Sequence, residues 1–161
     1  MIGLKFFSPS DIIRIGYIAS GMGALVEKYK RREIELTKDE AYTLENAKNF
    51  VDAIEKGFQN TQEPYRFSAN AFHSATYNCY VTVRLRFPFK RIPQTIDEIR
   101  DEILEFKTVL DEMMRGFTVD KIGKEKIEKV GLFFSNLGKM ALEQMYILDQ
   151  EKDSEREAMY A

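Results

Sequence analysis

Residues 95–117 read TIDEIRDEILEFKTVLDEMMRGF, and this stretch decides the fold class. Its apolar residues recur at alternating spacings of three and four, the repeat of a helix that buries one face. The seam consists of Ile96, Ile99, Ile103, Phe106, Leu110, Met113 and Phe117. Thr95 and Glu98 form a capping box, and Gly116 is typical of a helix end. We therefore predict an amphipathic helix packed antiparallel against a neighbour. The residues expected off the seam, in solvent, are Asp97, Glu98, Arg100, Asp101 and Lys107.

Three further segments carry the same periodicity. Ser8-Pro9 predicts a helix start, and the first helix should run to about Arg32. A capping box at 37–40 begins a second helix that should end near Gln59. A last helix should begin at Val119 or Lys124 and continue to about Lys152. Residues 151–161 form a charged tail that is expected to fray.

The stretch from Tyr65 to Arg86 is ambiguous. Its first half is rich in alanine and favours a helix, whereas residues 77–87 are rich in β-branched and aromatic side chains that suit a strand. A strand here would have no evident partner, and lone strands are rarely stable. We predict one helix, which the prolines of the segment 87–93 bring to an end.

The composition agrees with one helical domain. The chain has 161 residues, of which 44% are hydrophobic and 31% charged, with a formal net charge of −2 and only four prolines. This balance is that of a globular chain, and its bulk charge requires neither nucleic acid nor a membrane. We predict an all-α, antiparallel bundle of four to five helices that forms a single domain over residues 1–161.

The single cysteine and the single histidine limit the chemistry. With Cys79 alone no intrachain disulfide is available, and a reducing, cytoplasmic location fits a free thiol. With His73 alone, zinc-finger sites and the paired motifs of di-iron bundles are excluded. We expect no metal and no cofactor. The longest apolar stretch, Ile12 to Val26, contains Arg14 and is too short to span a bilayer, so no membrane partner is expected.

Four polar residues could form a site on the third helix. Arg66, Asn70, His73 and Tyr77 are spaced four, three and four, which places them along one helix face as a polar groove. An imidazole can move a proton near neutral pH, and a guanidinium can neutralise charge on a phosphate. The alternative is a polar contact between helices, with His73 hydrogen-bonded inside the bundle.

The spacing Arg66-x6-His73 in a compact helical chain resembles the HEPN superfamily. The resemblance covers about residues 40–80, and only Arg66 and His73 match the family's motif. It implies a metal-independent ribonuclease in which two such pairs meet across a dimer, with Arg66 and His73 as the catalytic residues. It equally allows an RNA-binding scaffold without activity, as many relatives of the superfamily are.

A second candidate is a basic and aromatic patch for RNA. It consists of Arg84, Arg86, Phe87, Phe89, Lys90 and Arg91. Such a patch can bind phosphates and stack exposed bases. The alternative is a loop whose phenylalanines cap the core while its cations remain in solvent. Two pairs of acids, Glu102/Glu105 and Glu125/Glu128, are similar to the magnesium ligands of all-α nucleotide pyrophosphatases, but acids beside a seam are normally solvated.

Small residues gather in the first helix. Gly16, Ser20 and Ala24 are spaced by four, with Ala19 and Gly23 beside them. Glycine inside a helix is unfavourable by about 1 kcal/mol relative to alanine, so this ridge indicates close helix packing. Together with the unbroken seam it favours a small helical interaction or assembly protein, homodimeric and without catalysis. The alternative function is a HEPN-like RNA-binding protein or ribonuclease.

Overall fold

The computed structural model describes residues 4, 7–33, 35–62 and 71–160, and within these ranges it contains six helices and no strand. The predicted all-α class is confirmed. The count exceeds the expected four to five because a single helical turn, α5, precedes the last helix. The helices are α1 (Pro9–Lys30), α2 (Lys38–Gln62), α3 (Ala71–Arg86), α4 (Ile96–Met114), α5 (Val119–Ile122) and α6 (Lys124–Tyr160).

The predicted helix starts are confirmed by their caps. The Ser8 hydroxyl accepts a hydrogen bond from the Asp11 amide at 3.1 Å, with Pro9 at the first helical position. The Thr95 hydroxyl accepts from the Glu98 amide at 3.1 Å. These bonds satisfy amides that have no partner within their own helix, so each cap determines where its helix begins.

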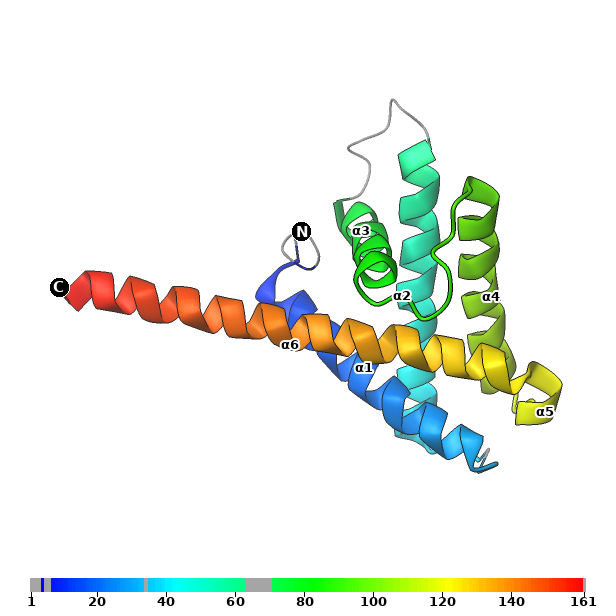
Figure 1. Ribbon diagram of the computed structural model, residues 1–161. Coiled ribbons are helices and arrows are strands. Elements are labelled where there is room, and N and C mark those ends of the chain that lie inside the picture. Colours follow the sequence, from blue (N-terminus) through cyan, green and yellow to red (C-terminus); the bar gives the residue numbers. More distant parts are fainter. Residues whose placement is uncertain (1–3, 5–6, 34, 63–70, 161) are drawn as a thin grey trace.

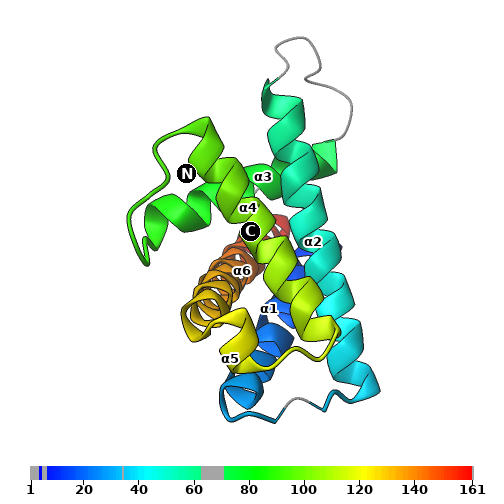
Figure 2. The same ribbon diagram turned by 90° about the vertical axis from the view of Figure 1, so that its right-hand side faces the viewer.

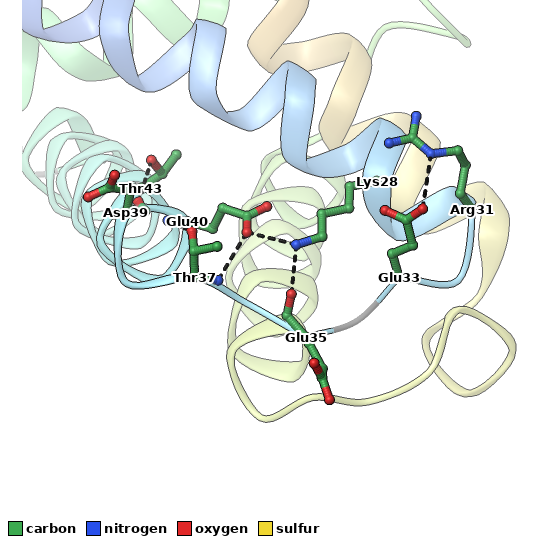
Figure 3. A network of polar contacts seen from close by, with 8 residues as sticks. All are labelled: Lys28, Arg31, Glu33, Glu35, Thr37, Asp39, Glu40 and Thr43. Carbon is green, nitrogen blue, oxygen red and sulfur yellow. Dashed lines mark hydrogen bonds and ion pairs between the residues drawn. The ribbon is translucent and has the colours of Figure 1, made fainter.

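The start of α2 is also held by α1. Thr37 and Glu40 form the predicted capping box, with amide-to-side-chain distances of 3.0 and 3.2 Å (Figure 3). The Lys28 ammonium lies 2.8 Å from Glu40 Oε1 and 2.7 Å from the Glu35 carbonyl oxygen. The end of α1 is thereby tied to the first turn of α2.

Some boundaries differ from those expected. The predicted end of the second helix near Gln59 is three residues early, because α2 continues to Gln62. Residues 77–86 are helical, which resolves the ambiguity against a strand, while 65–70 lie outside the described residues. Residues 151–159 are exposed, and the tail is helical to Tyr160 rather than frayed, since Glu, Lys, Arg and Ala all favour a helix and prolong α6.

The helices form two crossing groups. In Figure 1, α1 and α6 lie side by side and run antiparallel across the group of α2, α3 and α4. Figure 2 shows α2 and α4 alongside each other from a second direction. The C-terminal part of α6 extends beyond every other helix (Figure 1). None of the described helices is both long and apolar enough to cross a membrane.

The seam of α4 lies in the shared core. Ile103, Phe106, Leu110 and Met113 are at most 1% exposed, whereas Ile96 at the first turn is 57% exposed. Tyr80, Phe133 and other side chains from α1, α2, α3 and α6 complete the same cluster. The seam is therefore buried against helices of its own chain.

Lys107 of α4 was predicted to lie in solvent, and this prediction is wrong. Its ammonium lies 2.9 Å from Asp52 and 3.4 Å from Glu55, both on α2. The hydrogen bond to Asp52 raises the pKa of Lys107 above its ordinary value. The lysine thus bridges α4 and α2 at the border of the core. Sequence periodicity could not show this, because the partner acids belong to another helix.

The small residues of α1 pack against α6, which confirms close helix packing. A methyl group on Gly16 would lie 3.9 Å from the Cβ of Ala141. One on Gly138 would lie 3.2 Å from the Cβ of Ala19. In both pairs the two residue numbers add to 157, so the helices run antiparallel in one constant register. The small residues of α1 thus serve a contact between two helices of the same chain.

Candidate functional site

The predicted polar groove is described only in part. Arg66 and Asn70 lie outside the described residues, so the geometry of the proposed catalytic pair is not described. His73 lies in the first turn of α3 and is partly buried. Its pKa is lowered by burial and, to a lesser degree, by the nearby charge of Lys56. The imidazole is therefore neutral at pH 7.

Tyr77, the other described residue of the groove, faces α2 and the core. Its ring centroid is 5.8 Å from that of Phe58 and 6.2 Å from that of Tyr80. Burial raises the pKa of its phenol, so the hydroxyl stays protonated at neutral pH. The aromatic contacts make Tyr77 part of the packing between α2 and α3.

The cations of the basic and aromatic patch are paired with acids. Arg86 at the end of α3 forms an ion pair with Glu143 of α6. In the loop that follows, Lys90 Nζ lies 3.7 Å from Glu125, and Arg91 lies 3.1 Å from Glu98. A phosphate would have to compete with these carboxylates. The structure thus brings the patch together but leaves it locally neutral.

Phe87 and Phe89 stack with the arginines of the patch. The Arg86 guanidinium is 5.1 Å from the centroid of the Phe87 ring, and that of Arg84 is 4.2 Å from the Phe89 ring. Both rings also pack against the core cluster. The phenylalanines therefore cap the core, as the structural alternative predicted, and their contacts with arginine are made inside the chain.

Arg84 is the centre of a buried polar network. It is 2% exposed, and its Nε lies 2.8 Å from Oε1 of Glu102, which is itself 5% exposed. Arg84 also donates to the Arg91 carbonyl at 2.7 Å. Glu102 accepts from the Tyr80 hydroxyl at 2.7 Å and pairs with Lys129 at 3.2 Å. This network joins α3, the following loop, α4 and α6.

Burial of the network has a clear electrostatic consequence. Desolvation and the neighbouring Glu102 carboxylate raise the pKa of Tyr80 far above its ordinary value, so Tyr80 remains a donor. Two buried nitrogens of Arg84, Nε and Nη1, have no well-aligned hydrogen bond despite the short ion pair. Sequence reasoning missed this network. The only signal was a charged residue at 84 within an apolar run and another at 102 beside the seam.

The two pairs of acids are used in ion pairs. Glu102 and Glu105 both approach Lys129, the latter at 3.9 Å, while Glu125 pairs with Lys90. Glu128 lies 4.0 Å from Lys30. Within the described ranges no cluster of three or more histidine, cysteine or acidic side chains is arranged to hold a metal.

An apolar groove between α1 and α6 is the surface that sequence reasoning did not identify. It has a volume of about 580 Å³, and small residues of both helices are among those that line it. Four large apolar side chains stand exposed along and beside it: Ile13 (44%), Tyr17 (76%), Leu142 (74%) and Tyr146 (66%). Exposed apolar patches of this kind mark interaction surfaces. The available signal was in the last helix, where Leu132, Phe133, Met140 and Met145 widen the apolar face beyond a single seam.

Searches of protein-family models, of curated proteins and of solved structures found no match to this chain. The resemblance to the HEPN superfamily therefore stays a prediction that rests on Arg66 and His73.

Proposed function

We propose that this protein is a small helical assembly protein, without catalysis of its own, that forms a homodimer through the groove between α1 and α6. The observation that carries the proposal is the apolar cluster of Ile13, Tyr17, Leu142 and Tyr146 around that groove. Transfer of such side chains out of water yields roughly 25 cal/mol per Å² of apolar surface. A second copy would cover this surface on both partners at once, as two-fold dimers do.

The apolar seam of α4 and the small residues of α1, which predicted a dimer from the sequence, make their contacts within a single chain. The α4 seam packs in the core, and the small residues of α1 pack against α6. The small residues still contribute indirectly. Because they are small, they leave open space between the two helices, and large apolar side chains stand exposed along and beside this groove.

Analytical ultracentrifugation from about 0.5 to 100 µM tests the dimer. We expect a concentration-dependent change from monomer to dimer, and a monomer throughout for Leu142→Glu. Leu104→Glu is the matched control, because Leu104 is exposed on α4, away from the groove. Its association should equal that of the parent. A parent protein that stays monomeric while helical by circular dichroism would refute the proposal, as would a Leu142→Glu protein that dimerises normally.

An RNA-binding protein or metal-independent ribonuclease is the second candidate. The observation that favours it is the neutral, partly exposed imidazole of His73, the form that a general base requires. Incubation of the protein with RNA in EDTA should then give cleavage that His73→Ala abolishes. No cleavage, or cleavage that is equal in His73→Ala, would reject the ribonuclease. RNA binding without cleavage would leave only the adaptor role.

We also propose a reducing compartment, the cytoplasm, as the protein's location. Cys79 is fully buried, and burial raises the pKa of its thiol far above the ordinary value. Cys79 is the chain's single cysteine and is unpaired, as is usual for proteins of a reducing compartment.

A further inference from the structure

The exposed face of α6 follows a regular repeat. Its residues recur at alternating spacings of three and four: Leu132, Ser135, Lys139, Leu142, Tyr146, Asp149 and Asp153. All of them are exposed. Such a repeat places them in one line along a helix and is typical of a helix that pairs with another. The face borders the groove, so whatever covers the groove also meets this line.

None of the three charges on this line, Lys139, Asp149 and Asp153, has an ion-pair partner in the described part of the chain, and two of them flank its apolar centre. The two flanking charges are Lys139, whose ammonium lies 5.8 Å from the centroid of the Phe87 ring, and Asp149. They flank the apolar pair Leu142 and Tyr146 symmetrically, three residues away on each side. The sequence of the line is thus basic, apolar, apolar, acidic. When a second copy of the line runs antiparallel to the first, each basic residue therefore meets an acidic one and each apolar residue meets an apolar one.

We infer that α6 of one copy packs antiparallel against α6 of a second copy, in a register centred between Leu142 and Tyr146. This inference rests on the proposed homodimer and specifies its partner and register. Leu142 then meets the partner's Tyr146, and Lys139 meets the partner's Asp149. Both contacts occur twice, because the two-fold axis repeats them. Opposite charges at the edge of an apolar contact determine partner orientation in paired helices.

Neighbouring registers are less favourable. If the two-fold axis moves by half a heptad toward the N-terminus of α6, Lys139 lies against the partner's Leu142. If it moves the same distance toward the C-terminus, Tyr146 lies against the partner's Asp149. Each shift puts a charge against an apolar side chain and leaves the opposite charge unpaired, which is unfavourable on desolvation. Of these three registers, only the one we infer pairs apolar side chains with each other and Lys139 with an acid.

The register also accounts for the exposed side chains of α1 and for the length of α6. Residues of α1 and α6 that lie opposite each other have numbers that add to 157, so the exposed Ile13 lies beside position 144, the centre of the inferred contact. The exposed Tyr17 lies one helical turn further along α1. Residues 149–159 are exposed and extend beyond the other helices (Figure 1). In the dimer this segment runs along residues 129–139 of the partner's α6, and Asp153 reaches the partner's Ser135.

Disulfide cross-linking of Lys139→Cys/Asp149→Cys tests the register. Positions 139 and 149 of one helix are ten residues, or about 15 Å, apart, so no bond within a chain can form. In the dimer, residue 139 faces 149 of the partner, whereas each position is about 15 Å along the axis from its own equivalent. Mild oxidation should therefore give a covalent dimer for the double variant and not for either single variant. Cys79 stays in place because it is buried.

A charge exchange gives an independent measurement. Lys139→Glu should weaken the dimer about tenfold, since two ion pairs at the edge become repulsive. Adding Asp149→Lys should restore the dissociation constant to near that of the parent. If ultracentrifugation shows a dimer but neither the cross-link nor the restoration occurs, the register is wrong and the proposed dimer stands. If the parent is a monomer at all concentrations, both are wrong.

Discussion

Gly57 of α2 lies against the backbone carbonyl of His73 in α3, so closely that a methyl group at position 57 would overlap that oxygen. The same methyl would lie 2.7 Å from the Cβ of Tyr77. A backbone group cannot move aside as the end of a flexible side chain can. The absence of a side chain at Gly57 therefore determines how closely α2 and α3 pack, and with it the position of His73.

Gly57→Ala should destabilise the fold by about 1–3 kcal/mol, because α3 must shift away from α2. This loss outweighs the gain of about 1 kcal/mol that alanine brings to a helix interior. Gly23→Ala is the control, since a methyl there meets nothing within 4 Å, and it should be neutral or stabilising. Urea denaturation of both variants in the Leu142→Glu background, where self-association does not contribute, measures the difference. Equal effects would contradict the close approach.

Leu110→Ala should lower the free energy of unfolding by about 2–5 kcal/mol, through lost apolar burial and an unfilled cavity. Leu110 is fully buried in the α4 seam. The control is the same substitution on the same helix, Leu104→Ala, where the side chain is 44% exposed. Its loss should stay below about 1 kcal/mol. Similar losses for the two variants in chemical denaturation would show that the seam is not the core.

Glu102→Ala should be strongly destabilising, by about 3–5 kcal/mol, because it leaves the buried Arg84 guanidinium without its counter-ion. Glu105→Ala, whose carboxylate is partly exposed and 3.9 Å from Lys129, should cost less than about 1 kcal/mol. Replacing both members in Arg84→Met/Glu102→Met should cost less than the sum of the two single changes. Additive losses in thermal or urea denaturation would argue against a coupled pair.

His73 should titrate below its ordinary pKa of 6.5. Between the folded and unfolded pKa values the unfolded chain binds more protons, so the stability contributed by neutral His73 is complete above 6.5 and falls as the pH drops below it. NMR measures this directly, because one histidine gives one set of imidazole signals. Lys56→Gln should raise the pKa without restoring it fully, since burial remains the larger cause. A value at or above 6.5 in the parent would contradict the burial of His73.

Local patterns in the sequence determined the helices and their starts. The alternating spacing from Ile96 to Phe117 predicts the buried face of α4, and the hydroxyls of Ser8, Thr37 and Thr95 predict where three helices begin. These features depend on residues three or four positions apart, and such residues are neighbours on any helix. They can be read before the fold is known. The all-α class follows from them.

Tertiary structure alone decided which polar groups are buried and which apolar groups are not. The chain between Arg84 and Glu102 includes the end of one helix, a loop and the start of another, and only packing brings the two charges to 2.8 Å. The α1–α6 groove is lined by residues of two helices, and those of α1 lie more than a hundred positions before those of α6 in the sequence. Helical periodicity shows that a face is apolar but not what covers it, because the covering partner is chosen by packing across the whole chain.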